Sequence, residues 1–82
     1  MHDRSIMDSL IRKIEALARE NGALKVTLIR VELGTMAHMD ERHFLEHWEE
    51  SSRGTIADGA GVEVRASAQP FGVFLVDVEL ER

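Results

Sequence analysis

The chain has 82 residues, of which 44% are hydrophobic and 30% are charged, and these proportions are typical of one small globular domain. It contains no cysteine, which excludes disulfides, thiolate catalysis and cysteine-based zinc sites. The net charge of −5 disfavours a nucleic-acid partner, and no apolar run approaches the roughly 20 residues that a membrane span requires. Because the N-terminus lacks the apolar segment of a signal peptide, we expect a cytoplasmic domain.

Apolar residues spaced three and four apart predict a first helix from about Arg4 to Asn21. The helix should end there because Asn21 and Gly22 both tolerate the left-handed backbone that terminates helices. From Lys25 to Leu33 the apolar period falls to two, which predicts a β-strand. The apolar face of this strand is expected to comprise Thr27, Ile29, Val31 and Leu33.

A second helix is predicted from about Asp40 to Ser52, with the carboxylate of Asp40 as its N-cap. A glycine-bearing loop, Thr55–Gly61, leads to two more strands, which are joined by a turn at Gln69–Gly72. The order α-β-α-β-β predicts an α/β (α+β) two-layer sandwich, in which two helices cover one face of a three-stranded sheet. In the two later strands, the expected apolar faces are Val62, Val64 and Ala66, and then Phe74, Val76, Val78 and Leu80, which alternate with Val73, Leu75, Asp77 and Glu79.

The N-terminal sequence Met1-His2-Asp3 has the pattern of a planar metal site. A histidine in second position links the terminal amine, the His2 amide nitrogen and the His2 imidazole in small chelate rings, which suit Ni(II) or Cu(II) better than tetrahedral Zn(II). Asp3 is a candidate fourth donor, or a group that orients the other donors. The alternative is an inert N-terminus, since chain ends are commonly frayed.

The second helix offers a weaker metal candidate. His43 and His47 are four residues apart and would share one helix face with Asp40 and Glu50. The alternative is a solvated polar face opposite the apolar side, where Trp48 is expected to anchor the core.

His38 precedes this helix, between Met36 and Met39, where a surface histidine requires no metal and methionine more commonly fills gaps in a small core. The sequence shows no nucleophile paired with a base and no glycine-rich phosphate loop. We therefore expect a binding or delivery protein and not an enzyme.

Several short segments are distinctive in their order and spacing: Met1-His2-Asp3-x-Ser5-Ile6, Asn21-Gly22-Ala23, Val26–Gly34, Gly34–Asp40, Gly54-Thr55 and Gly59–Val64. Together they resemble the HypA/HybF family of nickel-incorporation proteins, which are accessory factors in the maturation of nickel–iron hydrogenase and, in some organisms, of urease. The resemblance implies a Ni(II)-binding metallochaperone that assists nickel insertion, with a nickel-delivery GTPase and a hydrogenase large-subunit precursor as partners.

The resemblance also implies the ligands. The family usually begins Met-His-Glu, and its first residues bind nickel, which points to Met1, His2 and Asp3 in this chain. Asp40 stands where some members have an acidic residue associated with the nickel site.

One departure from the family is large. Family members carry a zinc domain with two Cys-x-x-Cys pairs between the last two strands, whereas here Ala66–Gly72 joins those strands directly. We therefore expect residues 1–82 to form a single nickel-binding-type domain without a zinc domain or structural zinc. The alternative is an interaction or scaffold module that has kept the fold and lost metal delivery. Open sheet edges and a small core also make a homodimer an expectation.

Overall fold

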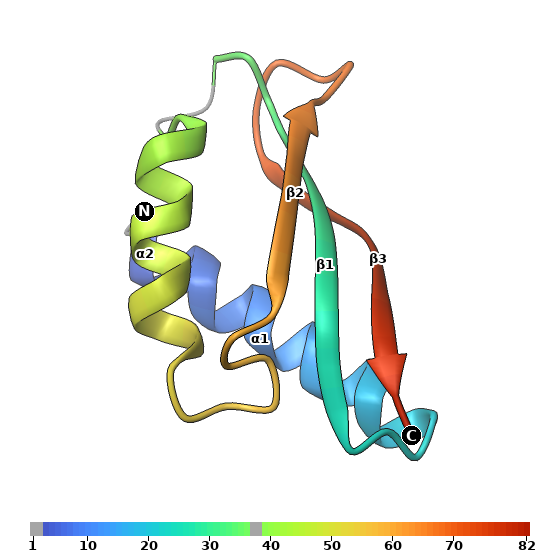
Figure 1. Ribbon diagram of the computed structural model, residues 1–82. Helices are drawn as coiled ribbons and strands as arrows, with labels where there is room; N and C mark the ends of the chain where they lie inside the picture. Colours follow the sequence, from blue (N-terminus) through green and yellow to red (C-terminus); the bar gives the residue numbers. More distant parts are fainter. Residues whose placement is uncertain (1–2, 37–38) are drawn as a thin grey trace.

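The computed structural model describes residues 3–36 and 39–82, and of Asp3 and Arg4 it describes the backbone alone. The elements follow the predicted order: α1 (Asp3–Glu20), β1 (Lys25–Leu33), α2 (Glu41–Ser52), β2 (Gly61–Ala66) and β3 (Val73–Glu81). The strand order is β2-β1-β3, so β1 is central, parallel to β2 and antiparallel to β3. Figure 1 shows α1 crossing behind the sheet and α2 flanking it beside β2. The predicted two-layer fold is confirmed.

The ends of the helices are set by local chemistry. Gly22 has a φ of +62°, and the Ala23 amide donates to the Ala18 carbonyl at 2.9 Å, so the chain leaves α1 through a left-handed residue. At the start of α2, the carboxylate of Asp40 accepts a hydrogen bond from the His43 amide at 2.9 Å, as the cap prediction requires.

The core lies between the helices and the sheet. Phe44 and Trp48 are both buried on α2, and their rings are stacked with centroids 6.4 Å apart. Trp48 therefore anchors the core, as predicted. The other buried apolar side chains come from α1, β1 and the loops, and they are Met7, Leu10, Ile11, Ile14, Ala18, Val26, Ile29, Val31, Leu33, Met39 and Ala57.

A β-bulge alters the predicted faces of β1. Val26 pairs with Leu80 of β3, and Leu28 pairs with the adjacent residue, Glu79. Thr27 therefore has no partner on β3 and is the extra residue of the bulge. As a result, Val26 is fully buried and Thr27 is exposed. The prediction that Thr27 belongs to the apolar face was wrong, although Ile29 and the following alternate residues do lie on it.

A second bulge alters β3. Arg30 of β1 pairs with Asp77, and the next residue, Val31, pairs with Leu75. Val76 therefore has no partner on β1 and is the extra residue of this bulge. The predicted strict alternation was therefore wrong for the first half of the strand. The residues that pack against the core are Val73, Leu75, Val78 and Leu80, whereas Phe74, Val76, Asp77 and Glu79 are exposed.

Ion pairs cover the sheet face opposite the helices. The guanidinium of Arg30 on β1 contacts the carboxylates of Glu63, Asp77 and Glu79 at 2.5–3.2 Å. The hydrogen bond to Asp77 is the main reason why the pKa of Arg30 is raised above its usual range. These carboxylates outnumber the cation, so this part of the sheet is acidic.

The connection between β2 and β3 is short and lies against the end of β1. The Gly34 amide donates to the Gly72 carbonyl at 2.9 Å, and the Met36 amide donates to the Pro70 carbonyl at 2.8 Å. A Cβ atom at Gly34 would overlap the Pro70 carbonyl, so this close approach requires glycine. The segment 69–72 joins the two strands as predicted, but it does not close a hairpin between them, because β2 and β3 lie on opposite sides of β1 and the segment crosses its end.

Candidate metal centre

The four residues predicted to hold metal differ in what the structure describes of them. Met1 and His2 lie outside the described residues. Asp3 is the first residue of α1, but its side chain is likewise outside the described part of the chain. Asp40 is described in full, as the residue that caps α2. The ligand set thus stays a prediction.

Asp40 already has a structural partner. Its Oδ1 atom accepts from the His43 amide at 2.9 Å and lies 3.1 Å from His43 Nδ1. The hydrogen bond from the His43 backbone is the main cause that lowers the pKa of Asp40 below its ordinary value, so the carboxylate is ionised at neutral pH. Both contacts use Oδ1, and the side chain is 70% exposed. Asp40 can therefore present negative charge to solvent without leaving the helix.

The histidines of α2 do not form a ready metal site. His43 is exposed and contacts Asp40, whereas His47 is half-buried and lines a polar pocket with Asp8 and Glu50. Within residues 3–36 and 39–82, side chains of Asp3 and Arg4 aside, no three histidine, aspartate or glutamate side chains are grouped closely enough to hold a metal ion. The predicted His43–His47 clasp gains no third ligand from this part of the chain. His38 lies outside the described residues.

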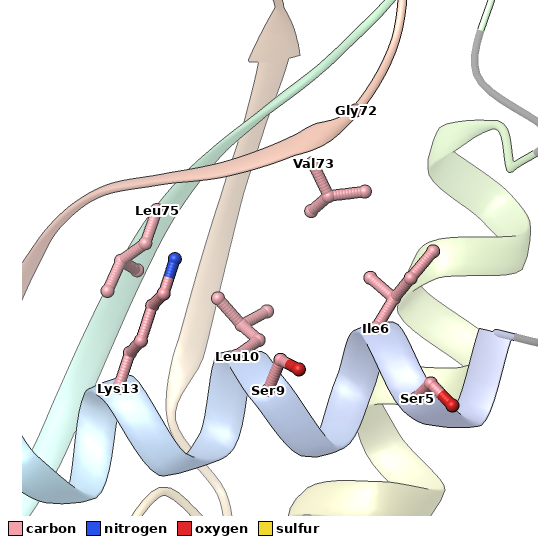
Figure 2. A pocket seen from close by; sticks show the side chains of 8 residues that line it. All are labelled: Ser5, Ile6, Ser9, Leu10, Lys13, Gly72, Val73 and Leu75. Atoms are coloured by element: carbon pink, nitrogen blue, oxygen red, sulfur yellow. The ribbon is translucent and has the colours of Figure 1, made fainter. Parts of the chain in front are cut away.

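A groove that the sequence analysis missed runs along the first turns of α1 (Figure 2). It has a volume of about 280 Å³ and lies between α1 and the start of β3. The sequence signal for it was a pair of small residues, Ser5 and Ser9, one helical turn apart on α1. Its full lining consists of Ser5, Ile6, Ser9, Leu10, Lys13, Gly72, Val73 and Leu75.

Comparison with known proteins places the chain in a family. Residues 1–71 match the profile of the family described as "Hydrogenase/urease nickel incorporation, metallochaperone, hypA".

In the part of the chain that the structure describes, no helix is long and apolar enough to cross a membrane.

Individual relatives agree with the family profile. The hydrogenase maturation factor HypA of Rhizobium leguminosarum bv. viciae is 34% identical over 68 residues, which are 83% of this chain and 60% of that protein. The corresponding factor of Rhodobacter capsulatus is 36% identical over 64 residues, which are 78% of this chain and 57% of that one. The chain thus spans less than two thirds of the length of these relatives. The match to HypA of Archaeoglobus fulgidus is 29% identical and covers 100% of this chain and 74% of the relative.

The fold is shared with a solved structure. The solution structure of the Ni metallochaperone HypA from Helicobacter pylori superposes with a TM-score of 0.85 at 18% identity, covering 99% of this chain and 98% of that chain. At this identity the likeness shows the fold alone. The family profile over most of the chain nevertheless leaves one conclusion: the protein belongs to the HypA family of hydrogenase and urease nickel-incorporation proteins.

Proposed function

We propose that this chain is a nickel metallochaperone that binds Ni(II) at its N-terminus and delivers it during the maturation of a nickel–iron hydrogenase or a urease. The observation that carries the proposal is the family match over residues 1–71, which includes the Met1-His2-Asp3 start. The relatives named above are hydrogenase maturation factors, which supports hydrogenase as the first enzyme to test.

The proposed site uses donors that are contiguous in the chain. With Met1 as the first residue, its amine, the amide nitrogen of His2 and the His2 imidazole provide three nitrogens in one plane. A helix that begins at Asp3 has no carbonyl partners for its first amides, so a neighbouring amide can lose its proton without breaking a helical hydrogen bond. Nickel binding displaces protons from these groups, and its affinity should therefore fall as the pH falls.

The start of α1 also imposes an electrostatic requirement. The N-terminal end of a helix carries partial positive charge, which disfavours a nearby cation. Deprotonation of the His2 amide removes one positive charge from the complex, and the carboxylate of Asp3 adds a negative charge as the fourth donor. Asp40 contributes a further ionised carboxylate, which raises affinity at longer range without being a required ligand.

Nickel is the cargo in this proposal and not a resident cofactor. Delivery requires ligand exchange with a recipient, and an open planar site at a chain end permits this more readily than a closed cage. The resemblance described above supports a nickel-delivery GTPase and a hydrogenase large-subunit precursor as partners in the cytoplasm. The family is one of metallochaperones, which supports a role without catalysis.

The family's zinc site does not fit this chain. The segment between β2 and β3 is Ser67-Ala68-Gln69-Pro70-Phe71-Gly72, and it contains none of the cysteine, histidine or carboxylate donors that zinc requires. Its backbone instead forms hydrogen bonds with the end of β1. We therefore propose that residues 1–82 act as a single nickel-binding domain that needs no structural zinc.

This same departure supports the alternative function, a metal-independent scaffold for other maturation factors or for a second copy of the chain. The two functions differ in one measurable property. A scaffold does not require nickel affinity at a free N-terminus, whereas a metallochaperone does.

The test is a calorimetric Ni(II) titration of untagged protein at neutral pH. We expect one site, and we expect His2→Ala to weaken it by at least about a hundredfold, because even loss of a group that merely supports a ligand costs 10–100-fold. One extra residue ahead of Met1 should have a similar effect, since it removes the terminal amine from the chelate. Binding that survives both changes would place nickel elsewhere, and no binding in any form would leave the scaffold function.

A further inference from the structure

The groove beside α1 is open to solvent at the outer edge of the sheet. Figure 2 views it from the β3 side, with β1 and β2 behind β3. Ile6 and Leu10 point from α1 toward β3, and Val73 points back toward the helix, which gives the groove an apolar floor. Ser5 and Ser9 also line the groove, and their side chains are too small to fill it.

The same segment of β3 presents unpaired backbone. In the strand order β2-β1-β3, β3 is an edge strand, and no described strand pairs with its outer side. The Gly72 carbonyl faces β1, because it accepts from the Gly34 amide at 2.9 Å. Alternation along the strand therefore directs the backbone groups of Val73 and Leu75 to the open edge. Two of the residues that line the groove thus also carry the free hydrogen-bonding groups.

The groove carries one cationic side chain, Lys13. Lys13 rises from α1 toward Leu75 at one end of the groove. Among the residues whose side chains the structure describes, no carboxylate forms an ion pair with Lys13. An occupant that carries a carboxylate at this end would supply the missing partner.

We propose that this groove binds an extended peptide segment of a partner protein, which adds a fourth strand to the outer edge of β3. The peptide places aliphatic side chains at alternate positions into the groove, bonds to the backbone of Val73 and Leu75, and carries an acidic side chain that pairs with Lys13. An extended backbone is required because only a strand matches the hydrogen-bonding groups of an edge.

A second copy of this chain is a poorer occupant than such a peptide. Pairing of β3 with a second β3 would bring Asp77, Glu79 and Glu81 of both copies onto adjacent strands. Like charges on neighbouring strands are destabilising, and the chain already has a net charge of −5. The proposal needs no metal, so it stands or falls separately from nickel binding.

The experiment is an NMR titration of isotopically labelled, metal-free protein with a synthetic probe. The probe is a blocked hexapeptide that alternates threonine with valine and ends in a glutamate whose side chain is its only carboxylate. We expect amide shift changes confined to residues 5–13 and 72–75. Changes elsewhere, or no change at millimolar peptide, would overturn the proposal. Concentration-dependent shifts of these same amides without peptide would also overturn it, because they would identify a second copy as the occupant.

Matched variants separate the two kinds of contact. A peptide with N-methylated backbone amides should bind at least about tenfold more weakly, since it cannot donate to the strand edge. Lys13→Glu should weaken the glutamate peptide about fivefold and favour a peptide that ends in lysine, whereas Arg12→Glu, an equal charge change on an exposed residue that does not line the groove, should do neither. Equal binding of the N-methylated peptide, or equal effects of the two variants, would refute strand addition at this site.

Discussion

Both helices begin beside an aspartate, but the two aspartates have different surroundings. Asp3 opens α1 and directly follows the two residues that supply the proposed nitrogen donors. Asp40 is far away in the sequence, and its carboxylate is held by His43 only when α2 is folded. Nitrogen donors that are contiguous in the chain require no fold to bring them together, whereas any contribution of Asp40 does. The comparison teaches that nickel affinity and folding stability should be largely separable in this protein.

The largest expected effect comes from a substitution that destabilises the fold and leaves the proposed nickel donors unchanged. Phe44 is fully buried and stacks on Trp48, so Phe44→Ala should lower the free energy of unfolding by about 3–5 kcal/mol. Phe71→Ala is the matched control, because Phe71 is 63% exposed and its truncation should stay within about 0.5 kcal/mol. Urea unfolding measures both changes.

Nickel affinity should respond differently to the same pair of variants. If the donors are contiguous, Phe44→Ala should change the Ni(II) dissociation constant by no more than about fivefold, even where much of the variant is unfolded. The measurement is a calorimetric titration of both variants. Loss of nickel binding in Phe44→Ala, with binding retained in Phe71→Ala, would show that the fold assembles the site and would contradict the comparison.

The next prediction concerns what nickel does to stability. A ligand stabilises a protein only as far as it prefers the folded state, and contiguous donors bind folded and unfolded chains almost equally. Saturating Ni(II) should therefore raise the melting temperature by no more than about 5 °C, whereas a site assembled by the fold would raise it by more than about 15 °C at a thousandfold excess over the dissociation constant. A thermal melt with and without nickel distinguishes the two, and the His2→Ala variant shows any effect of metal bound elsewhere.

The elements of the fold could be predicted because their signals are local. The apolar spacing of α1, the glycine stop at Gly22 and the cap at Asp40 each act within a few residues, and the structure confirms them. The faces of β1 and β3 were partly wrong, because the bulges at Thr27 and Val76 depend on how two distant strands pair. No periodicity within either strand reveals such a bulge.

The two candidate sites also differ in whether they depend on local sequence or on contacts between distant segments. The proposed nickel site could be suggested by Met1-His2-Asp3 alone, because its donors are adjacent in the sequence. The groove could not, because it is formed where α1 meets β3, and no local pattern in the sequence shows that these two elements lie side by side. Only the small residues on one face of α1 hinted that space would be left there.

A smaller effect on nickel affinity is expected from the carboxylate of Asp40. Two substitutions separate its role as the cap of α2 from its role as a negative charge. Asn can also cap a helix but carries no charge, so Asp40→Asn should lower the melting temperature only slightly, whereas Asp40→Ala should lower it by about 5 °C. Both variants lose the charge, so both should weaken nickel binding by no more than about fivefold. A loss of a hundredfold in both would make Asp40 a true ligand and would overturn the assignment of the site to contiguous donors.

The smallest expected effect is the dependence of the Asp40 cap on pH. Its pKa is lowered in the folded state, chiefly by the hydrogen bond from the His43 amide, so the ionised carboxylate favours folding. This contribution is fully present above the ordinary carboxylate pKa and is lost as the pH falls through the lowered value. Wild type should therefore be more stable than Asp40→Asn at neutral pH, and the difference should shrink toward zero on acidification, as urea unfolding of both proteins across this range can measure. A difference that persists in strong acid would mean that geometry, and not charge, makes aspartate the better cap at this position.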